Sequence, residues 1–199
     1  MTATEVAAGT ATAKAASPTE SPTSPPTSTS AEGGALFGPE SGSLKHDTSE
    51  NFVHTFEAGV SVRDFIAQAR FYNPFSRDLN SWDYGFFFRY IEDGGHYRLV
   101  VRSSRRWSLL YNTGSGDSNQ VREGVLSNLN IDANGYNDIK LVCLGDQCEF
   151  YLNDSLIATL DVSQHVEAGD IYVGTGFYTG NEVTGKETRF EDFTIWSNP

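Results

Sequence analysis

The stretch Leu141–Asp154, "LVCLGDQCEFYLND", predicts a β-hairpin and indicates the fold class of the whole chain. The Gly-Asp dipeptide at 145–146 favours a two-residue turn between antiparallel strands. Such a turn places Cys143 directly opposite Cys148. One face of the hairpin then carries only apolar side chains and the two sulfurs, namely Ile139, Leu141, Cys143, Cys148, Phe150 and Leu152.

The two cysteines are the only ones in the chain, and both are expected on the inward face of this hairpin. Directly opposed strand positions bring Cβ atoms to roughly 4.5–5.5 Å, which is close to what a disulfide requires. We therefore predict a Cys143–Cys148 disulfide, which is typical of an oxidising compartment. The alternative is a pair of buried free thiols that pack as small apolar residues. Because the loop is short, we expect the crosslink to contribute only modestly to stability.

A period of two residues recurs along most of the chain outside this hairpin. Between positions 97 and 102, for example, Tyr97, Leu99 and Val101 alternate with Arg98, Val100 and Arg102. Short β-rich runs separated by Gly, Asn and Asp are typical of an all-β sandwich or barrel. One short helix is expected, near Val162–Val166.

The first 35 residues have a different composition. They hold 9 Ala, 8 Thr, 5 Ser and 4 Pro, and no aromatic residue precedes Phe37. Such a segment buries too little apolar surface to offset the entropy cost of ordering it. Residues 1–35 are therefore predicted to form a disordered or extended linker. Residues 36–199 have the usual size of a single domain.

The formal net charge of the chain is −12, and most of it falls within residues 36–199. This acidity argues against a general nucleic-acid binder, which needs a basic surface. No apolar run approaches the length of a membrane span, so we expect no direct membrane insertion of this segment. No signal peptide is recognisable either, and an export signal or anchor upstream of Met1 is compatible with the pattern.

Several segments resemble concanavalin A-like jelly-roll domains. The hairpin segment 135–162 has their order of strand, tight turn and strand. The segment 171–196 has their glycine-rich strand followed by an F-x-x-F-x-I strand. The segments 36–46, 62–74 and 82–90 look like the early strands of bacterial extracellular, laminin-G-like members. The resemblance implies an antiparallel β-sandwich of two curved sheets, each with about six or seven strands.

The segment 82–90, "WDYGFFFRY", is rich in aromatic residues, as expected of a strand that packs one face against the core of a β-sandwich. One parity of the strand belongs to the core, so packing accounts for most of the rings. Phe87 lies on the other parity, with Asp83 and Arg89, and is expected to be either exposed or covered by a loop. The core parity would hold Trp82, Tyr84, Phe86, Phe88 and Tyr90.

The resemblance implies that ligands sit on the concave sheet or at its edge loops. Sugars there are held by an aromatic platform together with polar side chains. The basic cluster of Arg102, Arg105 and Arg106 would recognise carboxylated sugars or an acidic protein surface. The alternative is a solvated hairpin turn whose arginines pair with Asp and Glu. The candidate ligand-binding residues are Trp82, Arg89, Tyr97, Arg102, Arg106, Trp107, Tyr178 and Asn181.

Signatures of catalysis and of metal binding are weak. The E-x-D-x-x-E run of β-glucan-hydrolysing cousins does not occur, although glycosidases need two carboxyl groups. The spacing of Asp132, Asn134 and Asp138 is loosely like a calcium loop, and an ordinary Asn-Gly turn is the alternative. No cofactor is predicted, and calcium, which is common in such domains, has no position that the sequence identifies.

These patterns predict a non-catalytic extracellular or cell-surface module that binds a glycan or another surface molecule. A glycan-processing enzyme of the same superfamily is the first alternative, because its carboxylates would come from separate strands. The second alternative is a structural subunit of an extracellular filament or surface layer, built by self-assembly.

Overall fold

The computed structural model describes residues 34–49 and 53–198. The predicted linker, residues 1–35, lies almost wholly outside the described residues. The first strand begins at Ala35, one position before the predicted start of the domain. Within the described residues all regular structure is β, and no helix is long and apolar enough to cross a membrane. The helix expected near Val162–Val166 is absent, because these residues form a turn between two strands.

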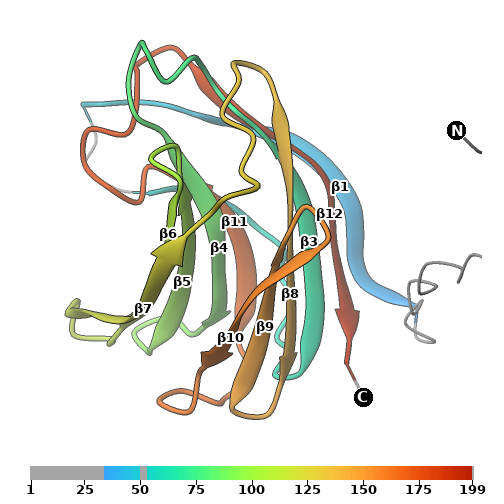
Figure 1. Ribbon diagram of the computed structural model, residues 1–199. Coiled ribbons are helices and arrows are strands. Elements are labelled where there is room, and N and C mark those ends of the chain that lie inside the picture. The colour runs from blue at the N-terminus through green and yellow to red at the C-terminus, as the bar shows by residue number, and fades with distance from the viewer. Residues whose placement is uncertain (1–33, 50–52, 199) are drawn as a thin grey trace, which may run out of the picture. The chain divides into compact units, whose positions relative to one another are not determined.

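Twelve strands of the described residues form two antiparallel sheets of six, which face each other as a sandwich (Figure 1). This confirms the predicted jelly-roll β-sandwich. Sheet A contains, in spatial order, β1 (Ala35–Lys45), β12 (Glu187–Ser197), β3 (Phe65–Tyr72), β8 (Tyr136–Leu144), β9 (Gln147–Leu152) and β10 (Ser155–Asp161). Sheet B contains β2 (His54–Glu57), β11 (Asp170–Thr175), β4 (Asp83–Tyr90), β5 (His96–Arg102), β6 (Arg106–Asn112) and β7 (Ser118–Val125).

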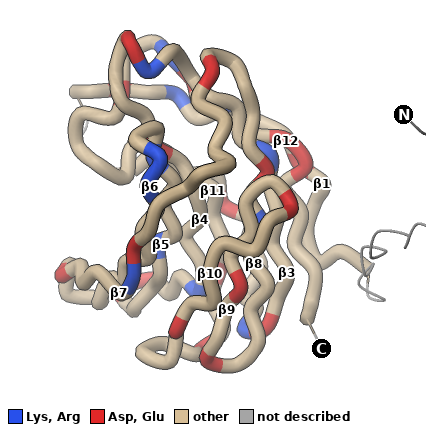
Figure 2. The backbone as a smooth tube through the Cα atoms, in the orientation of Figure 1, with Lys and Arg blue, Asp and Glu red and all other residues tan. Residues whose placement is uncertain are grey.

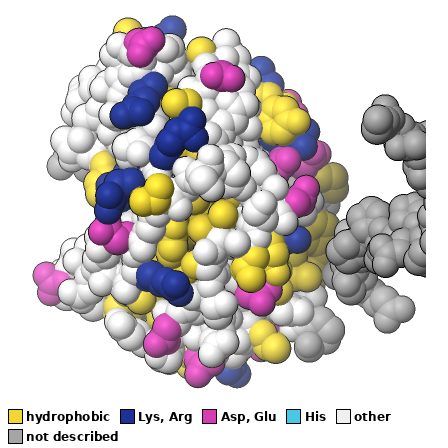
Figure 3. All heavy atoms as spheres, viewed as in Figure 1, with side chains coloured by type: hydrophobic (Ala, Val, Ile, Leu, Met, Phe, Trp, Pro, Cys, Tyr) yellow, Lys and Arg dark blue, Asp and Glu magenta, His cyan; other side chains and the backbone are white. Residues whose placement is uncertain are grey.

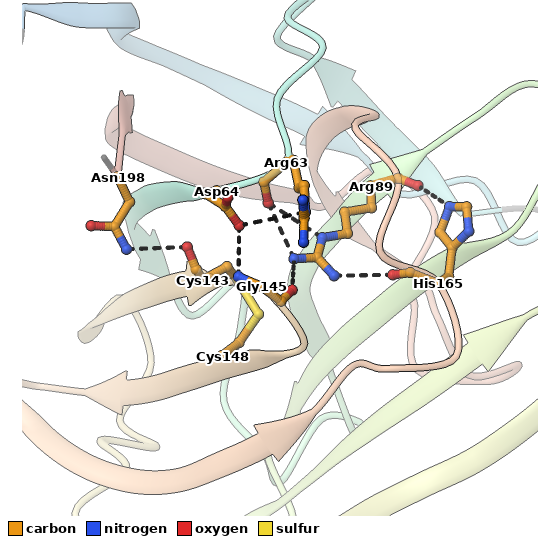
Figure 4. The surroundings of a disulfide bond; sticks show 8 residues. All are labelled: Arg63, Asp64, Arg89, Cys143, Gly145, Cys148, His165 and Asn198. Atoms are coloured by element: carbon orange, nitrogen blue, oxygen red, sulfur yellow. Dashed lines mark hydrogen bonds and ion pairs between the residues drawn. A yellow bond between two sulfur atoms is a disulfide. The ribbon is translucent and has the colours of Figure 1, made fainter.

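The β8–β9 hairpin has the predicted register. Cys143 pairs with Cys148 across the turn, and the two sulfurs form the predicted disulfide (Figure 4). Both cysteines are buried. The inward face is buried as well, because its alternate positions pack against sheet B; it comprises Ile139, Leu141, Phe150 and Leu152.

Aromatic rings from the two sheets interlock in the core. Phe71 of β3 stacks on Tyr84 of β4 with ring centroids 4.8 Å apart, and Trp107 of β6 meets Phe150 of β9 edge-on at 5.5 Å. Fully burying one such ring contributes about 1.5–3 kcal/mol to stability. The predicted core parity of β4 is confirmed up to its last residue, where Tyr90 is only partly buried. Its fully buried members are Trp82, Tyr84, Phe86 and Phe88.

Arg89 breaks the alternation at the end of β4, where its φ of 52° lies in the left-handed region. Its guanidinium group is fully buried at one end of the sandwich. It donates hydrogen bonds to the carbonyl oxygens of Arg63, Gly145 and His165 at 3.2, 2.6 and 3.0 Å (Figure 4). Arg89 therefore joins sheet B to the β8–β9 turn of sheet A. The prediction that it contacts a ligand is wrong, because it has no exposed surface.

Candidate functional site

The outward face of sheet B carries a cleft with a volume of about 730 Å³. Its floor comes from β2, β11, β4 and β5, and one wall comes from residues 176–182, which follow β11. We call residues 176–182 the wall segment. The side chains with rings or charge that line the cleft are Phe87, Tyr90, His96, Arg98, Tyr172, Phe177 and Glu182.

Five rings lie in contact along the cleft. Phe177 stacks on Phe87 with centroids 5.1 Å apart, and Tyr172 lies 4.9 Å from Tyr90. The imidazole of His96 lies between these pairs, 5.3 Å from Phe87 and 5.1 Å from Tyr90. Phe87 is therefore covered, with only 5% of its surface exposed, whereas Tyr90, Tyr172 and Phe177 remain partly exposed. The cleft offers the edges and faces of three rings to a ligand.

Asp83 holds the wall segment in place. Its carboxylate is fully buried at the start of β4 and accepts hydrogen bonds from the backbone N–H groups of Phe177 and Tyr178, at 2.9 and 3.1 Å. The side-chain amide of Asn181 donates a third, at 2.8 Å. Burial raises the pKa of Asp83 to about 6, and these donors limit that rise because they stabilise the ionised form.

His46 anchors the chain just beyond the wall segment. Its Nδ1 accepts a hydrogen bond from the backbone N–H of Val183 at 3.4 Å, and its Nε2 lies 2.8 Å from the Thr188 hydroxyl. Burial lowers the pKa of His46 to about 4, so the ring is neutral at pH 7. The wall segment is thus held at both ends by buried polar groups from distant parts of the sequence.

Arg98 is the cation of the cleft. Its guanidinium lies over the Phe87 ring at 4.8 Å, and its Nε donates a hydrogen bond to His96 Nε2 at 3.1 Å. Burial lowers the pKa of His96 to about 4, so its imidazole is neutral and can accept this hydrogen bond. Among the described residues, no carboxylate forms an ion pair with Arg98.

Glu182 supplies the carboxyl group of the cleft. It lies 3.5 Å from His54 Nε2, and burial raises its pKa. Around it the described lining also offers the exposed hydroxyl groups of Thr55 and Thr179. The described lining of the cleft therefore combines aromatic surface, hydroxyl groups, one arginine and one paired glutamate.

Four of the eight predicted ligand-binding residues belong to the packing of the sandwich. Besides Arg89, these are Trp82 and Tyr97, which are fully buried, and Trp107, which is 3% exposed. A sugar platform needs an exposed ring face, which these side chains do not provide. The predictions for Trp82, Tyr97 and Trp107 are corrected because these side chains lie on the inward parity, which faces sheet A, whereas Arg89 is buried through its left-handed backbone conformation.

Arg102 and Arg106 lie outside the residues that line the cleft. Both face Glu123 of β7, at nitrogen–oxygen distances of 4.0 and 3.0 Å. Arg102 also lies 4.7 Å over the Tyr178 ring, and Arg105 donates to a backbone carbonyl. Basic and acidic residues accordingly alternate around β6 and β7 (Figure 2), and basic side chains gather on that side of the surface in Figure 3. This arrangement matches the alternative of arginines that pair with acids.

Tyr178 and Asn181 are the two predicted residues on the wall segment itself. The Tyr178 hydroxyl lies 2.8 Å from that of Ser108, and the Asn181 amide is bound to Asp83. Both therefore position the wall. The rings and the arginine that line the cleft are absent from the predicted ligand-binding residues, although the alternation between 97 and 102 puts Arg98 on the face opposite Tyr97 and Phe87 was expected to be exposed or covered by a loop.

The loosely calcium-like segment has other partners. Asp138 forms an ion pair with Arg70 at 2.8 Å, and Asp132 and Asn134 lie in a turn. Across residues 34–49 and 53–198, no three His, Cys, Asp or Glu side chains gather as a metal site. A calcium position therefore stays a prediction without residues assigned to it.

No family model and no curated protein matches the sequence. Solved structures do match. A protein of unknown function with a galectin-like fold from Bacillus subtilis gives a TM-score of 0.59 at 13% identity, covering 83% of this chain and 87% of that chain.

Two further matches are proteins of carbohydrate chemistry. A carbohydrate-binding module from Bacillus subtilis gives a TM-score of 0.55 at 16% identity, over 74% of this chain and 84% of that chain. A Bacillus licheniformis β-glucanase gives a TM-score of 0.53 at 9% identity, over 73% of this chain and 72% of that chain. Together with the two six-stranded sheets, these matches show that the chain has the concanavalin A-like jelly-roll fold.

Proposed function

We propose that the domain is a non-catalytic module that binds a glycan in the cleft on sheet B. One observation carries this proposal: Tyr90, Tyr172 and Phe177 present partly exposed rings in a cleft of about 730 Å³. The C–H faces of a sugar ring pack on aromatic rings, while its hydroxyl groups need hydrogen-bonding partners. The hydroxyl groups of Thr55 and Thr179 are suited to that second role.

The cleft is built before any ligand arrives, which supports a binding role. Asp83 and His46 hold the wall segment through hydrogen bonds to its backbone and its neighbours. A preformed site loses less conformational entropy on binding than a loop that has to order. Affinity then depends on ring contacts and hydrogen bonds rather than on a folding step.

Binding is favoured over hydrolysis by the charges in the cleft. Glycoside hydrolysis uses two carboxyl groups that flank the scissile bond. Among the described lining residues, Glu182 carries the single carboxyl group, and it is paired with His54. The fold is shared with a carbohydrate-binding module and with a glucanase, so fold likeness by itself supports either function.

An extracellular or cell-surface location is part of the proposal. The Cys143–Cys148 disulfide supports it, because disulfides persist in oxidising compartments. The Ala/Thr/Ser/Pro-rich composition of residues 1–35 is that of a stalk that would display the domain.

A glycan array, run with and without calcium and followed by calorimetric titration of the sugars that bind, tests the proposal. We expect Tyr172→Ala and Phe177→Ala to weaken binding by about tenfold each, since a buried aromatic contact is worth roughly 0.5–1.5 kcal/mol beyond its area. Tyr136→Ala is the matched control, because Tyr136 is an exposed tyrosine on sheet A. Equal losses in all three variants, or turnover of the bound sugar, would contradict the proposal.

A further inference from the structure

Arg98 differs from the other arginines that lie over aromatic rings. The three other arginines found over rings among the described residues also form ion pairs: Arg70 with Asp138, Arg102 with Glu123 and Arg189 with Glu191. Arg98 has its ring, Phe87, but among the described residues it has no acidic partner. It is also the arginine that lines the cleft.

The two terminal nitrogens of Arg98 have no hydrogen-bond partner among the described residues. Its Nε is used by His96 Nε2, and its plane is supported by Phe87. No described residue accepts a hydrogen bond from Nη1 or Nη2. This end-on pair of N–H groups has the fork geometry that binds a carboxylate with two parallel hydrogen bonds.

The surroundings of Arg98 favour an incoming anion. The side chain is half-buried among rings, and burial lowers its pKa, so its surroundings disfavour the cation. A bound anion would offset that cost, because a partly desolvated pair interacts more strongly than an exposed one.

We propose, building on the glycan binding proposed above, that the cleft recognises a sugar unit that carries a carboxylate, with Nη1 and Nη2 of Arg98 holding it. The ring of that sugar packs on the partly exposed aromatic side chains beside Arg98. His96 is a positioning residue, which orients the guanidinium through its neutral Nε2.

The net charge of the chain restricts the expected class of ligand further. A net charge of −12 repels long polyanions, so a local cation in an acidic domain selects one carboxylate rather than a run of them. The ligand class is therefore a short or terminal uronic acid unit within an otherwise neutral glycan.

Calorimetric titration with oligosaccharides that end in glucuronic or galacturonic acid, and with the methyl esters of the same sugars, tests this inference. We expect the acid form to bind at least tenfold more tightly than the ester at low salt. Arg98→Met should remove that preference. Arg189→Met is the matched control, because Arg189 lies over Tyr72 on sheet A, and it should leave the preference intact. His96→Phe should reduce the ratio of acid to ester binding.

Each outcome decides the matter. If acid and ester bind equally, and Tyr172→Ala weakens both, the glycan-binding proposal stands and the carboxylate inference fails. If sulfated oligosaccharides bind and uronates do not, the inference fails in favour of a different anion. If none of these sugars nor any neutral glycan binds, both proposals fail. Thermal unfolding of Arg98→Met confirms that the variant is folded before its binding is interpreted.

Discussion

The outward faces of the two sheets use the same residue types, tyrosines and arginines among acids, with different results. On sheet A, Arg70 lies over Tyr136 and forms a two-point ion pair with Asp138. On the same face the Tyr72 hydroxyl donates to Glu191 at 2.7 Å. Each of these charges finds its partner within the face, which leaves a solvated surface with little to offer a ligand.

Sheet B is arranged the other way. Arg98 lies over Phe87 and pairs with no carboxylate of the described residues, and the wall segment adds Phe177 to the rings of the floor. A segment held by Asp83 converts this face into a cleft. The difference shows that composition does not make a binding site. A site arises where a charged group is left without an internal partner and where a second segment creates concavity.

Among the variants that distinguish the two faces, Asp83→Ala is expected to have the largest effect on stability and binding, because it removes the anchor of the wall segment. Three N–H donors would lose their buried acceptor, at about 1–3 kcal/mol for each donor left unsatisfied. We expect a loss of at least about 3 kcal/mol in the free energy of unfolding, together with loss of glycan binding. Urea unfolding monitored by tryptophan fluorescence measures the first quantity.

Glu191→Ala on sheet A is the control for Asp83→Ala. Glu191 also accepts a hydrogen bond from a tyrosine, but it is partly exposed, so water replaces the lost partner. Glu191→Ala should therefore lower the free energy of unfolding by no more than about 1 kcal/mol. Comparable losses in the two variants would mean that the two faces are held equally tightly.

A smaller effect is expected from acid, and it should be centred on the wall segment and the residues that hold it. The pKa values of His46 and His96 are lowered to about 4, so their stabilising effect is complete above about pH 6.5 and is lost as the pH falls toward 4. Asp83 acts in the opposite direction, because its pKa is raised to about 6 and protonation relieves its burial between pH 6 and 4.

The two histidines outweigh the one aspartate, so the net result is a loss of stability of roughly 3 kcal/mol between pH 7 and pH 4.5. Thermal unfolding over that range measures this loss. Backbone amide shifts in an NMR titration should move at Phe177 and Val183 before they move at residues 147–152. A uniform change over both sheets would count against this assignment.

The smallest effect is expected at the Arg70–Asp138 pair on sheet A. A double-mutant cycle with Arg70→Gln and Asp138→Asn should give a coupling energy of about 0.5–1 kcal/mol, because both side chains are partly exposed to water. Neither variant should change glycan binding. A loss of binding in either variant would mean that the binding site lies on the outward face of sheet A.

The hairpin at 145–146 was predictable because a two-residue turn and alternating strands act over a few neighbouring positions. The register, the inward cysteines and the core parity of 82–88 all follow from such local rules. The same rules failed at Arg89, where a left-handed φ turns the side chain out of the alternation. Nothing in the residues around it predicts that turn.

Local pattern alone predicted that the chain is all-β, which hairpin residues face the core and that the two sulfurs lie opposite each other, since adjacent strand positions point to opposite sides by geometry. The choice of a sandwich over a barrel came from the family resemblance. The tertiary structure alone decided that Phe177 covers Phe87, that Asp83 holds the wall segment and that Arg98 forms no ion pair with a described carboxylate. The first two of these facts depend on atoms separated by 90 to 95 positions in the chain, and only the pairing of distant strands brings such atoms together.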